Sequence, residues 1–143
     1  MRIRLLGASV AVAMTAFAAI AQDARIAVIV HPERHASLSV DELAQIYLRR
    51  KRLWGDGDPI VPLNLASGMA LRARFSQRVL RQSEARLADY WNRRYFDGLM
   101  PPATLASTAA VRRYVAADPG AIGYVPAAEA DPSVRVILYL DGE

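Results

Sequence analysis

The sequence predicts an α/β domain with three layers, in which helices cover both faces of a mostly parallel sheet. Short apolar runs alternate along the chain with longer segments whose apolar residues recur at helical spacing. The length of 143 residues suits one domain. Hydrophobic residues make up 53% of the chain, which indicates a folded protein and not a disordered one.

The strands are predicted from runs of apolar residues bounded by turn residues. The first run, 25–31, is continuous and ends at Pro32, so we expect a strand buried on both faces, as is typical of a parallel sheet. The segment 64–68 is expected to be a loop, and Pro101 and Pro102 are expected to break the chain. The predicted strands are 25–31, 60–63, 121–125 and 134–139.

The helices are predicted from capping residues and apolar stripes. Ser39 and Glu42 form a capping box, and the basic run 49–52 suits the negative end of that helix. A second helix begins near Met69, a third follows Ser83, and a fourth spans 108–117. Their apolar stripes are expected to face the core: Leu71, Phe75, Val79 and Leu80 on one helix, and Leu87, Tyr90, Trp91 and Tyr95 on the next.

The first residues have the pattern of a secretory signal peptide. Arg2 and Arg4 precede an apolar stretch, and Ala19-Ile20-Ala21 fits a cleavage site. We therefore expect a leader over 1–21 and an extracytoplasmic domain over 22–143. An uncleaved membrane anchor is the alternative, for which the apolar stretch is short.

Composition excludes several classes of function. The chain has no Cys, so it has no disulfide, no catalytic thiol and no Cys-based zinc site. Cleavage would lower the formal net charge from +4 to +2, and no basic stripe is interleaved with aromatic residues, so we do not expect nucleic acid as a partner.

Signatures of catalysis are also missing. His31 and His35 flank Glu33, but this spacing outside a helix is weak evidence for a metal, and a solvated loop explains it. We find no nucleophile elbow, phosphate-binding P-loop or dinucleotide fingerprint. The sequence therefore predicts neither an enzyme nor a cofactor.

The segment 64–72 is the most informative candidate site. It follows a predicted strand and leads into a helix, where ligands bind in open α/β sheets. The start of that helix offers backbone N–H groups to an anion. Ser67 offers a hydroxyl, Gly68 allows close approach to the backbone, and Arg72 offers a charge. An ordinary capped helix with a surface arginine is the alternative.

Several segments resemble the phosphate-binding proteins of ABC transporters. The helix 38–48, the turn Arg52-Leu53-Trp54-Gly55-Asp56-Gly57 and the strand before Ser67-Gly68 occur in that family's order. The segment Asp118-Pro119-Gly120-Ala121-Ile122-Gly123-Tyr124-Val125 is similar to the family's Pro-Gly-Ala-Ile-Gly-Tyr strand. The resemblance covers most of 25–140 and implies a type II periplasmic binding protein fold and a periplasmic location.

The chain departs from this family in two respects. The family binds its ligand between two lobes, and this chain has the length of one lobe. In the ligand loop, Met69 replaces a small hydroxyl residue, and Asn64 lies near the place of the family's arginine.

Two functions remain open at this point. The first is a solute-binding module for phosphate or a similar oxyanion in ABC-type uptake or sensing, with Ser67, Gly68, Met69, Arg72, Ser107 and Thr108 as ligand-binding candidates. Its partners would be an ABC transporter permease or a membrane sensor, and two chains in a homodimer would enclose the ligand. The second is an interaction module without a ligand, using the surfaces 49–52 and 91–96 to contact a membrane protein.

Overall fold

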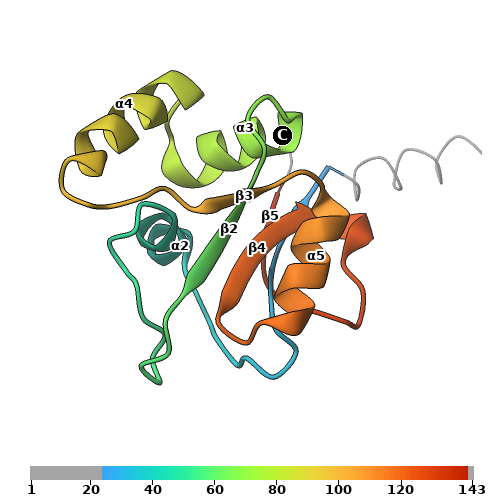
Figure 1. Ribbon diagram of the computed structural model, residues 1–143. Helices are drawn as coiled ribbons and strands as arrows, with labels where there is room; N and C mark the ends of the chain where they lie inside the picture. The colour runs from blue at the N-terminus through green and yellow to red at the C-terminus, as the bar shows by residue number, and fades with distance from the viewer. Residues whose placement is uncertain (1–23, 142–143) are drawn as a thin grey trace, which may run out of the picture.

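The computed structural model describes residues 24–141, which form a five-stranded sheet with helices on both faces (Figure 1). The expected leader lies outside the described residues. Within residues 24–141, no helix is long and apolar enough to cross a membrane. In chain order the elements are β1 (Ile26–Val30), α2 (Val40–Tyr47), β2 (Val61–Leu65), α3 (Ala70–Phe75), the π-helix η1 (Ser76–Leu80), α4 (Glu84–Tyr95), β3 (Ala103–Leu105), α5 (Thr108–Ala117), β4 (Ala121–Pro126), the 3₁₀-helix η2 (Ala127–Glu129) and β5 (Arg135–Leu140).

The sheet has the strand order β3-β2-β4-β1-β5, and it is mostly parallel in that four strands run in one direction and β1 runs opposite to them. β2 pairs in parallel with both β3 and β4, which confirms the predicted sheet type. β1 is buried along its whole length, as expected, but it is antiparallel to both β4 and β5. Burial on both faces therefore comes from the helices that cover the sheet and does not require parallel neighbours, and the parallel pairing inferred from the apolar run of β1 was wrong.

Helices cover the sheet on both sides, which confirms the three-layer αβα arrangement. On one face, α5 packs over β4, with Val111 and Val115 lying against Gly123. On the other face, Tyr47 of α2 and Phe75 of α3 pack against Tyr124. Neighbouring residues of a strand point to opposite faces, so Gly123 and Tyr124 each belong to a different half of the core.

α2 begins as predicted and ends earlier. Ser39 Oγ accepts from Glu42 N at 3.1 Å, and Ser39 N donates to Glu42 Oε2 at 2.9 Å, so the capping box is present. The helix ends at Tyr47, and Arg49 has a φ of 61°. The basic run 49–52 therefore lies outside the last turn of α2, and its expected contact with the helix dipole was wrong.

Two strands differ from the sequence prediction. β2 continues to Leu65, so Asn64 and Leu65 belong to the sheet and the loop begins at Ala66. β3 was missed, because three residues after two prolines carry no alternating pattern of their own. The pairing of β3 with β2 creates this strand, with Asn64 opposite Thr104.

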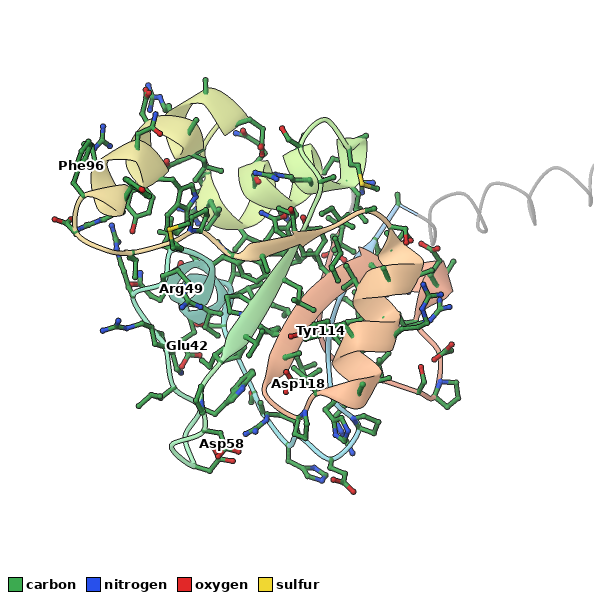
Figure 2. All side chains as sticks on the ribbon, viewed as in Figure 1. Glu42, Arg49, Asp58, Phe96, Tyr114 and Asp118 are labelled. Carbon is green, nitrogen blue, oxygen red and sulfur yellow. The ribbon has the colours of Figure 1, made fainter. Side chains whose placement is uncertain are left out.

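α4 packs through a small apolar cluster of its own. Leu87 and Tyr90 are buried against Leu48, and the Tyr90 hydroxyl donates to Leu48 O at 2.9 Å. Tyr95, predicted to face the core, is 63% exposed, and Phe96 lies at the outer end of the helix (Figure 2). The core prediction for Tyr95 was wrong because α4 ends beyond the edge of the cluster that it contacts.

Candidate functional site

The Ser67 loop, residues 66–69, lies at the edge of the sheet where three parallel strands end. β2 runs directly into it, and β3 and β4 lie on either side of β2 with the same direction. Ala66 N donates to Leu105 O at 3.0 Å, which ties the loop to the end of β3. The loop and the start of α5 therefore lie at the same edge, as the sequence predicted.

The loop presents backbone donors to solvent. Gly68 has a φ of 88°, and a Cβ placed there would meet no atom within 4 Å. Met69 is the N-cap of α3 but provides no side-chain cap. Among residues 24–141, no acceptor is found for the N–H groups of Ser67, Gly68, Ala70 and Leu71. These donors and the exposed Ser67 hydroxyl are the groups that the loop offers to an anion.

Arg72 lies beside the loop, but groups of its own chain already engage it. Its Nη1 donates to Leu65 O at 2.9 Å, and its Nε lies 3.0 Å from Glu84 Oε2. The second contact is an ion pair without good hydrogen-bond alignment, since Arg72 Nε has no hydrogen-bond partner. Glu84 thus offsets the charge that the sequence assigned to ligand binding.

Asn64 and Tyr124 fix the floor beneath the loop. Asn64 Oδ1 accepts from the Tyr124 hydroxyl at 2.5 Å and from Leu65 N at 2.9 Å. The Tyr124 ring stacks on Phe75 with 3.8 Å between ring centroids. Burial raises the pKa of Tyr124 well above its ordinary value, so the phenol stays protonated and serves as a donor. Asn64 is therefore a rigid support for the strand end.

The start of α5 already carries an acidic neighbour. Ser107 caps the helix, with its Oγ accepting from Ala110 N at 3.1 Å. The Thr108 hydroxyl donates to Glu129 Oε1 at 3.0 Å, and Arg112 Nη1 holds Glu129 O at 2.8 Å. The Glu129 carboxylate thus competes with any external anion here. Sequence reasoning missed Glu84 and Glu129, because no local motif links either residue to the site.

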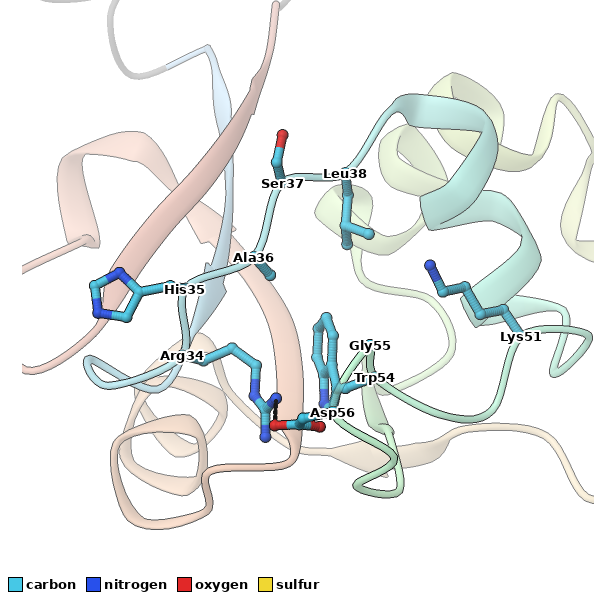
Figure 3. A pocket seen from close by; sticks show the side chains of 9 residues that line it. All are labelled: Arg34, His35, Ala36, Ser37, Leu38, Lys51, Trp54, Gly55 and Asp56. Carbon is cyan, nitrogen blue, oxygen red and sulfur yellow. Dashed lines mark hydrogen bonds and ion pairs between the residues drawn. The ribbon is translucent and has the colours of Figure 1, made fainter.

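A second hollow, of about 360 Å³, lies between the loop 34–38 and the Trp54 turn (Figure 3). Arg34 donates to Asp56 Oδ2 at 2.8 Å, to Asp58 Oδ2 at 3.0 Å and to Pro119 O at 2.8 Å. Its guanidinium also lies 4.9 Å from the centre of the Trp54 ring. These contacts join three loops and use the donors of Arg34, so we interpret this hollow as structural.

The two histidines lie in the loop that follows β1. His31 Nδ1 accepts from Glu33 N at 3.2 Å, and His35 is exposed. In the part of the chain that the structure describes, no group of three or more potential metal ligands is found.

Several solved structures share this fold, among them two proteins whose names give phosphate transport as their role. A phosphate ABC transporter substrate-binding protein from Clostridium perfringens, solved with bound phosphate, matches 78% of this chain with a TM-score of 0.66 and 20% identity. An ABC-type phosphate transport receptor from Vibrio cholerae matches 78% with a TM-score of 0.63 and 17% identity. PstS from Borrelia burgdorferi matches 70% with a TM-score of 0.54 and 15% identity.

This chain has the fold of a single lobe of these proteins. It spans 43% of the Clostridium protein, 44% of the Vibrio protein and 39% of the Borrelia protein. At these identities the likeness establishes the fold and leaves the ligand open. No family model matches the sequence, and no curated protein matches it.

Proposed function

We propose that this protein is an extracytoplasmic solute-binding domain that binds phosphate or a related oxyanion at the Ser67 loop. The unpaired N–H groups at the start of α3, next to the Ser67 hydroxyl, carry this proposal. They lie at the carboxyl ends of parallel strands, and neighbours of the same fold are phosphate-binding proteins. ABC-type uptake or sensing is the setting that these neighbours suggest.

The electrostatics of the loop predict weak binding by one copy of the chain. Glu84 offsets Arg72, and Glu129 lies at the neighbouring helix start. A single lobe also leaves one side of the ligand in water, where each hydrogen bond to an anion gains less than in an enclosed site. Tight binding therefore requires a second surface over the loop, either a second copy of the chain or a membrane partner.

The test is calorimetric titration of inorganic phosphate into residues 22–143, with light scattering on the same sample. We expect binding in the wild type and none in Gly68→Val, because a β-branched residue at this positive φ displaces the loop donors. Gly98→Val is the matched control, since Gly98 has a φ of 75° and open space around it but lies at the far end of α4. Equal affinity in wild type and Gly68→Val would exclude the Ser67 loop as the site.

A second candidate function is an interaction module that contacts a membrane protein. Its support is the exposure of Tyr95, Phe96 and Met100 at the end of α4, which are 63%, 89% and 59% exposed. Solvated aromatic side chains in one segment are typical of contact surfaces. This function would be favoured over the first if titration of millimolar phosphate gave no heat and if a purified membrane partner bound the wild type but not Phe96→Ser.

A further inference from the structure

The surface between η1 and α4 contains a pocket of about 440 Å³ that is separate from the Ser67 loop. Three of its six lining residues are arginines, Arg81, Arg86 and Arg93, and Asp89 is the single acid. Among residues 24–141, no carboxylate lies within ion-pair distance of these three guanidinium groups. The pocket thus carries three guanidinium groups against one carboxylate and has a net positive charge.

Two of the arginines occupy positions that their local structure disfavours. Arg81 ends a π-helix and has a φ of 53° and a ψ of 36°, a left-handed conformation that glycine or asparagine adopts at lower cost. Arg86 is the third residue of α4, and its N–H donates to the Ser83 cap. A capping box has Glu or Gln at this position, and a cation is unfavourable near a helix N-terminus.

The third arginine completes one face of the helix. Arg86, Asp89 and Arg93 are three and four residues apart, so their side chains project from the same side of α4. The buried residues Leu87 and Tyr90 hold α4 in place through the contact with Leu48. A rigid helix thus carries two guanidinium groups, and the left-handed turn at Arg81 brings a third to the same hollow.

We propose that this arginine pocket binds a small anion with more than one phosphoryl group. Guanidinium groups match phosphoryl oxygens with paired hydrogen bonds, and three of them around one hollow suit a multivalent anion better than a single phosphate. The hollow has the volume of a small-molecule site. Binding here explains why a left-handed residue and a residue at a helix N-terminus are both arginine.

The probe is inorganic pyrophosphate, titrated into residues 22–143 at low salt. Arg86→Gln and Arg93→Gln are each expected to raise the Kd about tenfold, as loss of a charge-assisted hydrogen bond predicts. Asp89→Asn is expected to lower the Kd, because it removes the one negative charge of the pocket. Arg113→Gln on α5 removes the same charge from an exposed site elsewhere and is expected to leave the Kd unchanged.

Arg81→Gly separates binding from folding. Glycine relieves the left-handed backbone, so the melting temperature is expected to rise while the affinity for pyrophosphate falls. An arginine that served only the fold would give the opposite change in stability.

Amide chemical shifts locate the bound anion and keep this proposal distinct from the Ser67 loop. Shifts confined to residues 80–93, unchanged in Gly68→Val, would support the arginine pocket even if phosphate does not bind the loop. Three results would each overturn it: shifts confined to residues 66–72, an equal loss of pyrophosphate affinity in Arg113→Gln and Arg86→Gln, or no binding at millimolar pyrophosphate.

Discussion

Gly123 in β4 allows α5 to lie directly on the sheet, and replacing it with alanine tests this packing. A Cβ at Gly123 would lie 2.5 Å from Val111 Cγ1 and 3.4 Å from Val115 Cγ2. The first distance is far inside the van der Waals limit, and both valines are almost fully buried. The helix must therefore move away from the sheet, or Val111 must leave its rotamer.

The expected cost of Gly123→Ala is about 2 kcal/mol, the middle of the range for an overpacked core. For a domain of this size that corresponds to a fall in melting temperature of about 8 °C. Val111→Ala removes the opposing methyl groups and is itself expected to cost about 2 kcal/mol. The double variant is expected to lose about 2 kcal/mol and not about 4, because the new methyl group fills the space that Val111 vacates.

Thermal and urea unfolding of the four proteins, followed by circular dichroism, measures this coupling. Gly55→Ala is the control, since a Cβ there meets no atom within 4 Å, and it is expected to leave the stability almost unchanged. If the two single costs add to within about 0.5 kcal/mol in the double variant, the close approach of α5 to Gly123 is refuted.

Three further predictions concern charge and protonation. Arg34→Lys is expected to lower the melting temperature, because lysine cannot contact Asp56, Asp58 and the Pro119 carbonyl together; an unchanged melting temperature would contradict this. Hydrogen bonds from the Asp58 N–H, and to a smaller extent from Arg34, lower the pKa of Asp56. The stability that this carboxylate adds is therefore present at neutral pH and is lost as the pH falls through its folded pKa. Asp56→Asn should reduce this loss when unfolding is measured over a series of acidic pH values. Burial raises the pKa of Tyr47 and Tyr124, so fewer than six phenols should ionise at pH 11 in the folded protein, and all six after unfolding in guanidinium. Because the folded state holds those protons more tightly, stability should fall as the pH rises above the ordinary tyrosine pKa, and full ionisation before unfolding would contradict the burial of both rings.

Local signals in the sequence were sufficient for most elements. The capping serines Ser39, Ser83 and Ser107 begin three helices as predicted, because a cap depends on contacts with residues three positions away. The apolar runs located four of the five strands, because each run is a pattern of neighbouring residues. Gly120 in the motif at 118–125 is instead required by a contact between distant segments, since a Cβ there would lie 2.7 Å from Pro59 O.

The candidate site was predicted only in part. The sequence placed Ser67 and Gly68 at the end of a strand, and the structure has them there. It assigned Arg72 to the ligand, whereas Glu84 and Leu65 O hold that guanidinium. Glu84 reaches Arg72 through the fold, and no spacing rule links two residues on separate helices.

By itself, the sequence determined the fold class, the positions of the helices and the loop that most resembles an anion site, because each depends on short-range patterns of apolar, capping and glycine residues. The tertiary structure alone decided the antiparallel pairing of β1, the existence of β3 and the neutralisation of Arg72. It also decided the gathering of Arg81, Arg86 and Arg93 around one hollow. Each of these depends on contacts between segments distant along the chain, and the free energy of such contacts appears only when the segments meet.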